Sequence, residues 1–176
     1  MILVRDELEV LLVRRNPAAR FMGGVWVFPG GALAEGETHR AAGVRELAEE
    51  AGVVLPDPEA LIAFSRWITP AQLSIRFDTW FFLARLPEGA ELRPDGAETV
   101  DLRWYAPAEA LGASRRGEIE LVFPTIRHLE ALADFGSAAE LLEWAAGREV
   151  EPVEPQLLME GEVARVVMPG EPGYRE

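Results

Sequence analysis

Apolar positions along the chain follow two different patterns. Runs rich in β-branched and aromatic residues predict strands at 9–14, 25–28, 60–69, 73–84 and 99–105. Helical patterns predict a long helix at 38–51, a short helix from Pro107, and two further helices at 124–134 and 137–147. Because strand and helix patterns interleave, they indicate an α/β or α+β protein with a mixed sheet.

The ends of these elements carry local signals. Thr38 is placed to cap the helix at 38–51, and Gly52 stands just beyond its end. At the start of the chain, ILVR at 2–5 predicts only a short strand. The tail is rich in Pro, Gly and Glu, and VARVVM at 163–168 predicts one short strand in it.

Length and composition fit a single domain over 1–176, with a core over about 1–115 and C-terminal helices and tail over about 116–176. No apolar run reaches about 18 residues, so neither a transmembrane helix nor a membrane partner is expected. The chain has no cysteine, which excludes disulfides, thiolate metal sites and cysteine nucleophiles. Early acidic residues argue against a signal peptide, so a cytoplasmic location is the expectation.

The charge of the chain restricts its partners. The net charge is −13, from 30 acidic and 17 basic residues. A long nucleic acid is not an expected partner, because proteins that bind one usually present a basic face. A small anion carried by metal ions remains compatible with this charge. All 17 basic residues are arginine, so no lysine can act in catalysis.

Three carboxylates gather near the C-terminal end of the helix predicted at 38–51. Glu46, Glu49 and Glu50 fall within an arc of about 100° on a helical projection, opposite an apolar arc. They repel one another, and the helix dipole disfavours each by about 0.3–1 kcal/mol. A solvated acidic face would explain an isolated cluster. Here the cluster follows a glycine-rich turn, FPGG at 28–31, and hard oxygen ligands at one place suit Mg²⁺ or Mn²⁺.

The segment GALAEGETHRAAGVRELAEEAGV at 31–53 resembles the Nudix box, in which glycine, glutamate and Arg-Glu-apolar-x-Glu-Glu-x-Gly-apolar stand at fixed spacings. The nine defined positions are met by Gly31, Glu37, Arg45, Glu46, Leu47, Glu49, Glu50, Gly52 and Val53. The resemblance implies a Nudix-type α/β/α sandwich with a mixed sheet, here with extra C-terminal helices. It also implies hydrolysis of nucleoside diphosphates that are linked to another group.

Carried over by position, the resemblance implies a role for each residue of the box. Glu49 and Glu50 would bind Mg²⁺ or Mn²⁺, and Glu46 would bind the metal or orient the attacking water. The carbonyl oxygen of Gly30 would be a further ligand. The remaining positions would be structural: Gly31, Glu37, Arg45 and Gly52.

The implied chemistry also needs a proton acceptor. Divalent cations would neutralise the diphosphate and lower the pKa of a bound water, and a carboxylate would then remove the proton. Glu98, six residues before Trp104, is our candidate for a further catalytic acid from outside the box; an exposed loop glutamate is the alternative interpretation. An ion pair between Arg45 and Glu37 would hold the loop.

The segment LLVRRNPAARFMGGVWVFPGG at 11–31 resembles the motif that precedes the box in coenzyme A diphosphatases, LLTxRSxxLRxHxGxxxFPGG. Arg15 and Arg20 match it and would bind substrate phosphates; surface charge is the alternative interpretation. The segments at 76–84 and 123–145 also resemble bacterial relatives of the peroxisomal coenzyme A and acyl-coenzyme A diphosphatase branch. The five tryptophans are expected to lie mostly in the core.

Coenzyme A or an acyl-coenzyme A is therefore the first expected substrate, within the class of small nucleotides. ADP-ribose, an NDP-sugar, a dinucleotide or an oxidised nucleotide are the alternatives. A non-catalytic module that senses a nucleotide is the second hypothesis, and a calcium-binding or purely structural acidic domain is the third. The C-terminal helices would cover the substrate cleft or bury the interface of a homodimer, which family habit allows.

Overall fold

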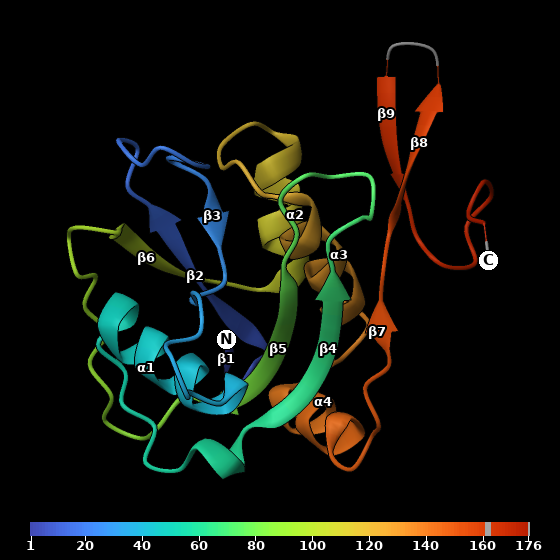
Figure 1. Cartoon of the computed structure of the whole chain (residues 1–176). Coiled ribbons are helices and arrows are strands. Elements are labelled where there is room, and N and C mark those ends of the chain that lie inside the picture. The colour runs from blue at the N-terminus through green and yellow to red at the C-terminus, as the bar shows by residue number, and fades with distance from the viewer. Residues whose placement is uncertain (161–162, 176) are drawn as a thin grey trace. The chain divides into compact units, whose positions relative to one another are not determined.

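The computed structural model describes residues 1–160 and 163–175 (Figure 1). These residues form two compact units. The first unit combines Met1–Ile62 with Phe82–Ala146, and the second combines Ala63–Phe81 with Gly147–Glu176. All the box residues belong to the first unit. The single domain expected over 1–176 stays a prediction.

The mixed sheet of the first unit is built around β2 (Glu9–Arg15). This strand pairs antiparallel with β1 (Ile2–Arg5), with β3 (Trp26–Val27) and, along its other edge, with β6 (Thr99–Tyr105). β1 also pairs in parallel with the last residues of β5 (Asp78–Arg85). The strands predicted at 9–14, 25–28 and 99–105 are therefore confirmed, and so is the short strand at the start of the chain.

The helix α1 (His39–Ala51) follows its local capping signals. The side chain of Thr38 accepts a hydrogen bond from the backbone N–H of Ala41, at 3.2 Å. Gly52 adopts the left-handed conformation, with φ of 73°, and its N–H donates to the carbonyl oxygen of Ala48. Glycine suits this position because it pays no steric penalty at positive φ. Both predicted ends of the helix are thus confirmed.

The other helices of the first unit are short. They are α2 (Pro107–Arg115), α3 (Phe123–Leu132), α4 (Ala138–Ala145) and one turn of 3₁₀ helix, η1 (Pro58–Ala60). Proline begins α2 and is the second residue of α3, where its missing N–H costs no helical hydrogen bond. None of the helices in the described residues is long and apolar enough to cross a membrane.

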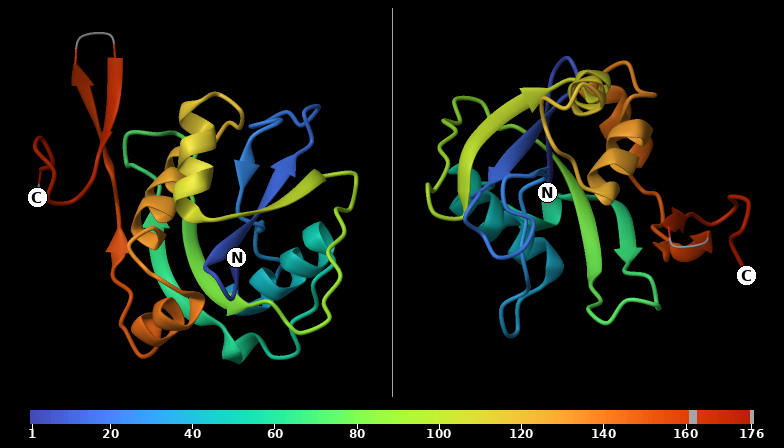
Figure 2. Two further views of the ribbon diagram at one scale, coloured as in Figure 1. Left: turned by 180° about the vertical axis from the view of Figure 1, so that it is seen from behind. Right: turned by 90° about the horizontal axis from the view of Figure 1, so that it is seen from above.

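The layers of the first unit enclose one apolar core. Figures 1 and 2 show α1 on one face of the sheet and α2 and α3 on the other, the expected α/β/α arrangement. Four consecutive residues of β2, from Val10 to Val13, are fully buried, because helices cover the side chains of both faces. Burial of each such side chain contributes about 1.5–3 kcal/mol. This core fixes the position of α1 and of the loop before it.

The second unit contains β4 (Ile62–Ile68) apart from its first residue, the first residues of β5, and β7 (Pro152–Val153), which pairs in parallel with β4. β8 (Gln156–Glu160) and β9 (Val163–Val167) form an antiparallel hairpin. β9 confirms the strand predicted at 163–168. The start predicted for β5 is wrong: residues 73–77 form part of the turn that joins β4 to β5, with the Thr69 N–H donating to the Phe77 carbonyl oxygen at 2.9 Å.

Candidate active site

The loop between β3 and α1 lies against the glutamates of the helix. The backbone N–H of Gly30 donates to Oε2 of Glu50 at 2.8 Å. A Cβ atom at Gly31 would lie only 2.3 Å from Oε1 of Glu46, so the missing side chain leaves the space that this carboxylate occupies. The absence of a side chain at Gly31 thus lets the backbone approach the Glu46 carboxylate closely.

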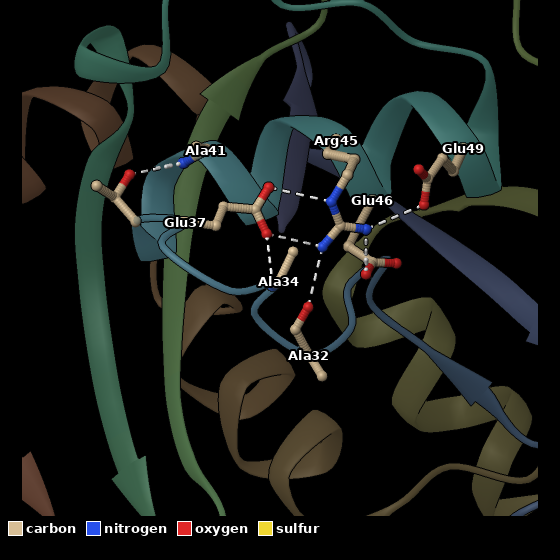
Figure 3. Close-up of polar contacts among 8 residues, drawn as sticks. Ala32, Ala34, Glu37, Ala41, Arg45, Glu46 and Glu49 are labelled. Carbon is tan, nitrogen blue, oxygen red and sulfur yellow. Dashed lines mark hydrogen bonds and ion pairs between the residues drawn. The ribbon is translucent and has the colours of Figure 1, made fainter.

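Arg45 connects the loop with the helix (Figure 3). Its guanidinium donates to both carboxylate oxygens of Glu37, at 3.0 Å each, and to the carbonyl oxygen of Ala32 at 2.9 Å. Its Nη1 donates to Glu46 at 2.7 Å and to Glu49 at 3.0 Å. These hydrogen bonds hold the pKa of Glu37 below its ordinary value and raise that of Arg45. The expected ion pair of Arg45 with Glu37 is present.

The three glutamates differ in exposure. Glu46 and Glu50 are buried, and only Glu49 faces solvent, with its side chain 59 % exposed. The alternative interpretation, a solvated acidic face, therefore does not describe Glu46 and Glu50. The physical reason is that the loop packs on this side of α1 and covers Glu46 and Glu50, so polar periodicity does not report exposure here.

Glu50 has the most strongly perturbed pKa among these carboxylates. Burial raises the pKa of Glu50 to about 7, and the charges of Glu46 and Glu98 act in the same direction. The hydrogen bond from the Gly30 N–H opposes this shift only in part. A carboxyl group that titrates near neutral pH is suited to exchange a proton during catalysis.

Glu98 approaches this place from the loop before β6. The hydroxyl of Thr99 donates to the carbonyl oxygen of Glu50 at 2.8 Å, which attaches the loop to the end of α1. The Glu98 carbonyl oxygen accepts from the Asn16 N–H at 2.8 Å, while Glu98 itself is exposed. The structure therefore brings Glu98 close enough for its charge to raise the pKa of Glu50.

The two arginines singled out in the sequence are placed differently. Nε of Arg15 is buried and has no hydrogen-bond partner among the described residues. Arg20 is exposed on the loop after β2. In the described part of the chain, no hydrogen bond or ion pair joins either arginine to the three glutamates of α1. The buried Nε of Arg15 is thus an unused donor at the end of β2.

A cavity of about 720 Å³ lies elsewhere in the same unit, and its residues were not predicted as a site. Arg14, Trp26 and Arg103 line it together with the segment that follows α2. The sequence contains part of the information needed to predict this cavity. Arg14 and Trp26 lie on one face of the sheet once β2 and β3 are paired in the observed register. That register is not visible in a single strand.

The carboxylates of α1 are the candidate place for a metal ion. Within residues 1–160 and 163–175, no group of three or more acidic or histidine side chains is arranged to hold one. Glu46 and Glu50 lie under the loop, whereas Glu49 is held by Arg45 on the outside of the helix. Two buried carboxylates remain, and their hard oxygen atoms are the donors that Mg²⁺ and Mn²⁺ prefer.

An α/β/α sandwich in which a glycine loop lies over glutamates of the following helix defines the Nudix fold. Residues 1–124 match the NUDIX domain, and the chain belongs to this family. The crystal structure of a NUDIX hydrolase from Alicyclobacillus acidocaldarius is similar, with a TM-score of 0.70 and 26 % identity over 81 % of this chain and 92 % of that one. The α/β/α fold class and the family predicted from the sequence are both confirmed.

Two curated relatives are acyl-coenzyme A diphosphatases. The chain is 36 % identical to acyl-coenzyme A diphosphatase NUDT19 of Homo sapiens over 126 residues, or 69 % of this chain. It is 31 % identical to NUDT19 of Xenopus laevis over 104 residues, or 57 % of this chain. The matched regions span only 34 % and 27 % of those two proteins. The chain therefore resembles about a third of each relative.

Proposed function

We propose that the chain hydrolyses the diphosphate linkage of a nucleoside diphosphate derivative and depends on Mg²⁺ or Mn²⁺. The observation that carries this proposal is the pair of buried carboxylates, Glu46 and Glu50, beneath the loop at Gly30 and Gly31. Membership of the Nudix family supports it. Arg45 supplies a counter-charge to Glu46, whereas burial of Glu50 outweighs the Gly30 hydrogen bond and the N-terminal ammonium that oppose it, so the burial of Glu50 is costly unless this carboxyl group has a function.

The residues present fit a hard divalent cation by the chemistry of their donors. Glu46, Glu49, Glu50 and the carbonyl oxygen of Gly30 would hold it. Glu49 is exposed and accepts a hydrogen bond from one nitrogen of Arg45, so no burial of its carboxylate opposes binding to the ion. When bound, the cation neutralises phosphate oxygens and lowers the pKa of a coordinated water.

The chain's own residues would supply positioning and proton transfer. Arg45 positions Glu46 and the loop through its hydrogen bonds to Glu37 and Ala32. Glu50, whose pKa lies at about 7, or the nearby Glu98 would accept the proton of the attacking water.

Coenzyme A or an acyl-coenzyme A is the proposed substrate. The similarity to acyl-coenzyme A diphosphatases supports it, and the guanidinium of Arg15, at the end of β2, would bind a substrate phosphate. Arg20, exposed on the following loop, would bind a second phosphate. ADP-ribose, NDP-sugars, dinucleotides and oxidised nucleotides are the alternative substrates.

The test measures product release from a panel of these substrates with Mg²⁺, Mn²⁺ or EDTA. From coenzyme A we expect 3′,5′-ADP and 4′-phosphopantetheine. Glu49→Gln and Glu50→Gln should each lower kcat by about 10²–10⁴-fold, because a carboxylate oxygen is lost from the metal and from proton transfer. Circular dichroism should show an unchanged fold.

Glu109→Gln, an exposed glutamate on α2, is the matched control and should retain the parent rate. If Glu50→Gln hydrolyses every substrate as fast as the parent, the assignment of the site is wrong. Absence of both products from coenzyme A, with hydrolysis of another diphosphate, would exclude the proposed substrate alone. Stabilisation by a nucleotide without any product would favour a sensing module.

A further inference from the structure

The cavity lined by Arg14, Trp26 and Arg103 has a composition that fits a ligand better than a packing defect. A volume of about 720 Å³ is in the range of small-molecule sites. Its wall combines an indole ring and two guanidinium groups with the backbone of Gly23, Gly24 and Gly117. An empty packing defect would be apolar, whereas this wall offers hydrogen-bond donors.

The planar guanidinium of Arg103 lies over the indole ring of Trp26 in this cavity. Its Cζ lies 5.3 Å from the centre of the Trp26 ring, and the edge of Tyr105 packs against the same indole at 6.2 Å. Trp26 is buried, but the side chain of Arg103 is 57 % exposed. One face of the guanidinium therefore rests on the indole, and its other face is open to stack on an aromatic ring.

Arg14 supplies an anion-binding group beside this surface. Its Nε donates to the carbonyl oxygen of Gly24 at 3.3 Å, which positions the head of the side chain. Among the described residues, its two Nη groups have no hydrogen-bond partner. They are therefore able to bind a phosphate in the bidentate geometry that arginine favours.

Of the nearby acidic residues, Asp101 forms an ion pair with Arg103 at 3.3 Å, and no ion pair with Arg14 is present among the described residues. Glu118 is bound by Arg116 through two hydrogen bonds, at 2.6 and 2.9 Å, so its charge is already balanced. Glu120 is exposed, and its carbonyl oxygen accepts from the Trp26 N–H. Its carboxylate is an acceptor for an amino or hydroxyl group of a ligand.

The cavity is within reach of the carboxylate site along the chain. Trp26 and Gly30 are four residues apart, which limits the distance between their Cα atoms to about 14 Å. One nucleotide could therefore extend from the cavity to the loop that contains Gly30.

We propose that this cavity binds the nucleoside phosphate part of the substrate, with the base stacked on Arg103 and a phosphate bound by Arg14. This inference rests on the proposed function for the identity of the ligand, since it assigns the nucleotide half of a coenzyme A-like molecule. It adds the residues that recognise that half and places them outside the Nudix box.

The binding test uses the full chain in EDTA and isothermal titration calorimetry with adenosine 3′,5′-bisphosphate. Arg103→Met and Arg14→Met should each weaken binding by about tenfold or more, because stacking or a charged hydrogen bond is lost. Arg103→Lys should bind the bisphosphate more weakly than the parent, because lysine keeps the positive charge but lacks the planar guanidinium on which a base would stack. Arg85→Met is the control: Arg85 is also an exposed strand arginine paired with one carboxylate, Asp6.

Kinetics then separate this inference from the proposed function. With a hydrolysed substrate, Arg103→Met should raise KM about tenfold and leave kcat within about twofold of the parent, because the contact is equal in the ground and transition states. If Arg103→Met and Arg85→Met bind the bisphosphate equally, or if the parent does not bind it at millimolar concentration, the inference is overturned. If no diphosphate is hydrolysed, the proposed function is wrong. The calorimetry still shows whether the cavity binds a nucleoside phosphate.

Discussion

Glu46 occupies the space that a side chain at position 31 would need. For this reason Gly31→Ala should displace the carboxylate, since the added Cβ would meet its Oε1 at 2.3 Å and its Cδ at 2.5 Å. The obstacle is the flexible end of a side chain, so the fold should yield there at little cost. We expect kcat/KM to fall about 10²-fold through misplacement of the carboxylate, with nearly unchanged Tm. Steady-state kinetics and thermal melts by circular dichroism check both.

Gly36→Ala is the matched control in the same loop. Gly36 has φ of 75°, and a Cβ there would meet no atom within 4 Å. Alanine should cost about 1 kcal/mol of stability through backbone strain and leave kcat unchanged. Full activity of Gly31→Ala would show that the close approach of the loop to Glu46 has no part in the reaction.

Sequence reasoning located the box residues but not their surroundings. The resemblance was sufficient to anticipate the ion pair of Arg45 with Glu37, because this pair depends only on one helix and the loop before it. The burial of Glu46 and Glu50 depends on how the loop packs, which periodicity does not contain. Arg14 was missed for a similar reason, since its neighbours come from other strands.

At the scale of elements, features that depend on local sequence signals were predicted, whereas features that depend on distant pairing partners were not. The ends of α1 were predicted because Thr38 and Gly52 act on adjacent backbone. The strands β7 and β8 were not predicted, because their residues become strands only through pairing with β4 and β9. The late start of β5 has the same origin: Leu73, Ile75 and Phe77 are exposed although their sequence favours a strand.

The helix α3 contains a buried histidine that should make stability depend on pH. His128 is 2 % exposed, and its Nδ1 donates to the carbonyl oxygen of Pro124 at 2.6 Å. Burial lowers the pKa of His128 to about 4. Between pH 4 and about 6.5 the unfolded chain binds the proton and the folded chain does not, so the free energy of unfolding falls as pH is lowered through this range.

His128→Gln should remove this contribution, which is at most about 3 kcal/mol. Urea unfolding of parent and variant at pH 4.5, 5.5, 6.5 and 7.5 measures it as a difference. His39→Gln, in the exposed first turn of α1, is the control and should keep the dependence of the parent. If the free energy of unfolding changes with pH equally in His128→Gln and in the parent, the low pKa of His128 is contradicted.

For the whole molecule, burial of acidic groups in a chain of net charge −13 should link folding to both pH and Mg²⁺. Burial raises the pKa of Glu50 from 4.5 to about 7, so between these values the folded protein binds more protons than the unfolded chain. In EDTA, the contribution of Glu50 therefore lowers the free energy of unfolding as pH rises from about 4.5 to about 7. This is opposite in sign to the effect of His128, so each is measured against its own variant.

Mg²⁺ should reverse the penalty at Glu50, because it binds the deprotonated carboxylate of the folded protein. At 100 times its Kd it should stabilise the fold by about 2.7 kcal/mol, more at pH 8 than at pH 5, where protons compete for Glu50. Urea unfolding of the parent and of Glu50→Gln, in EDTA and in Mg²⁺ at both pH values, tests this linkage. In EDTA, Glu50→Gln should lose the contribution of Glu50 to the pH dependence of the free energy of unfolding. The variant should also lose most of the stabilisation by Mg²⁺. If Mg²⁺ stabilises parent and variant equally at both pH values, the ion binds away from Glu50. The reaction that we propose would then not take place at Glu50.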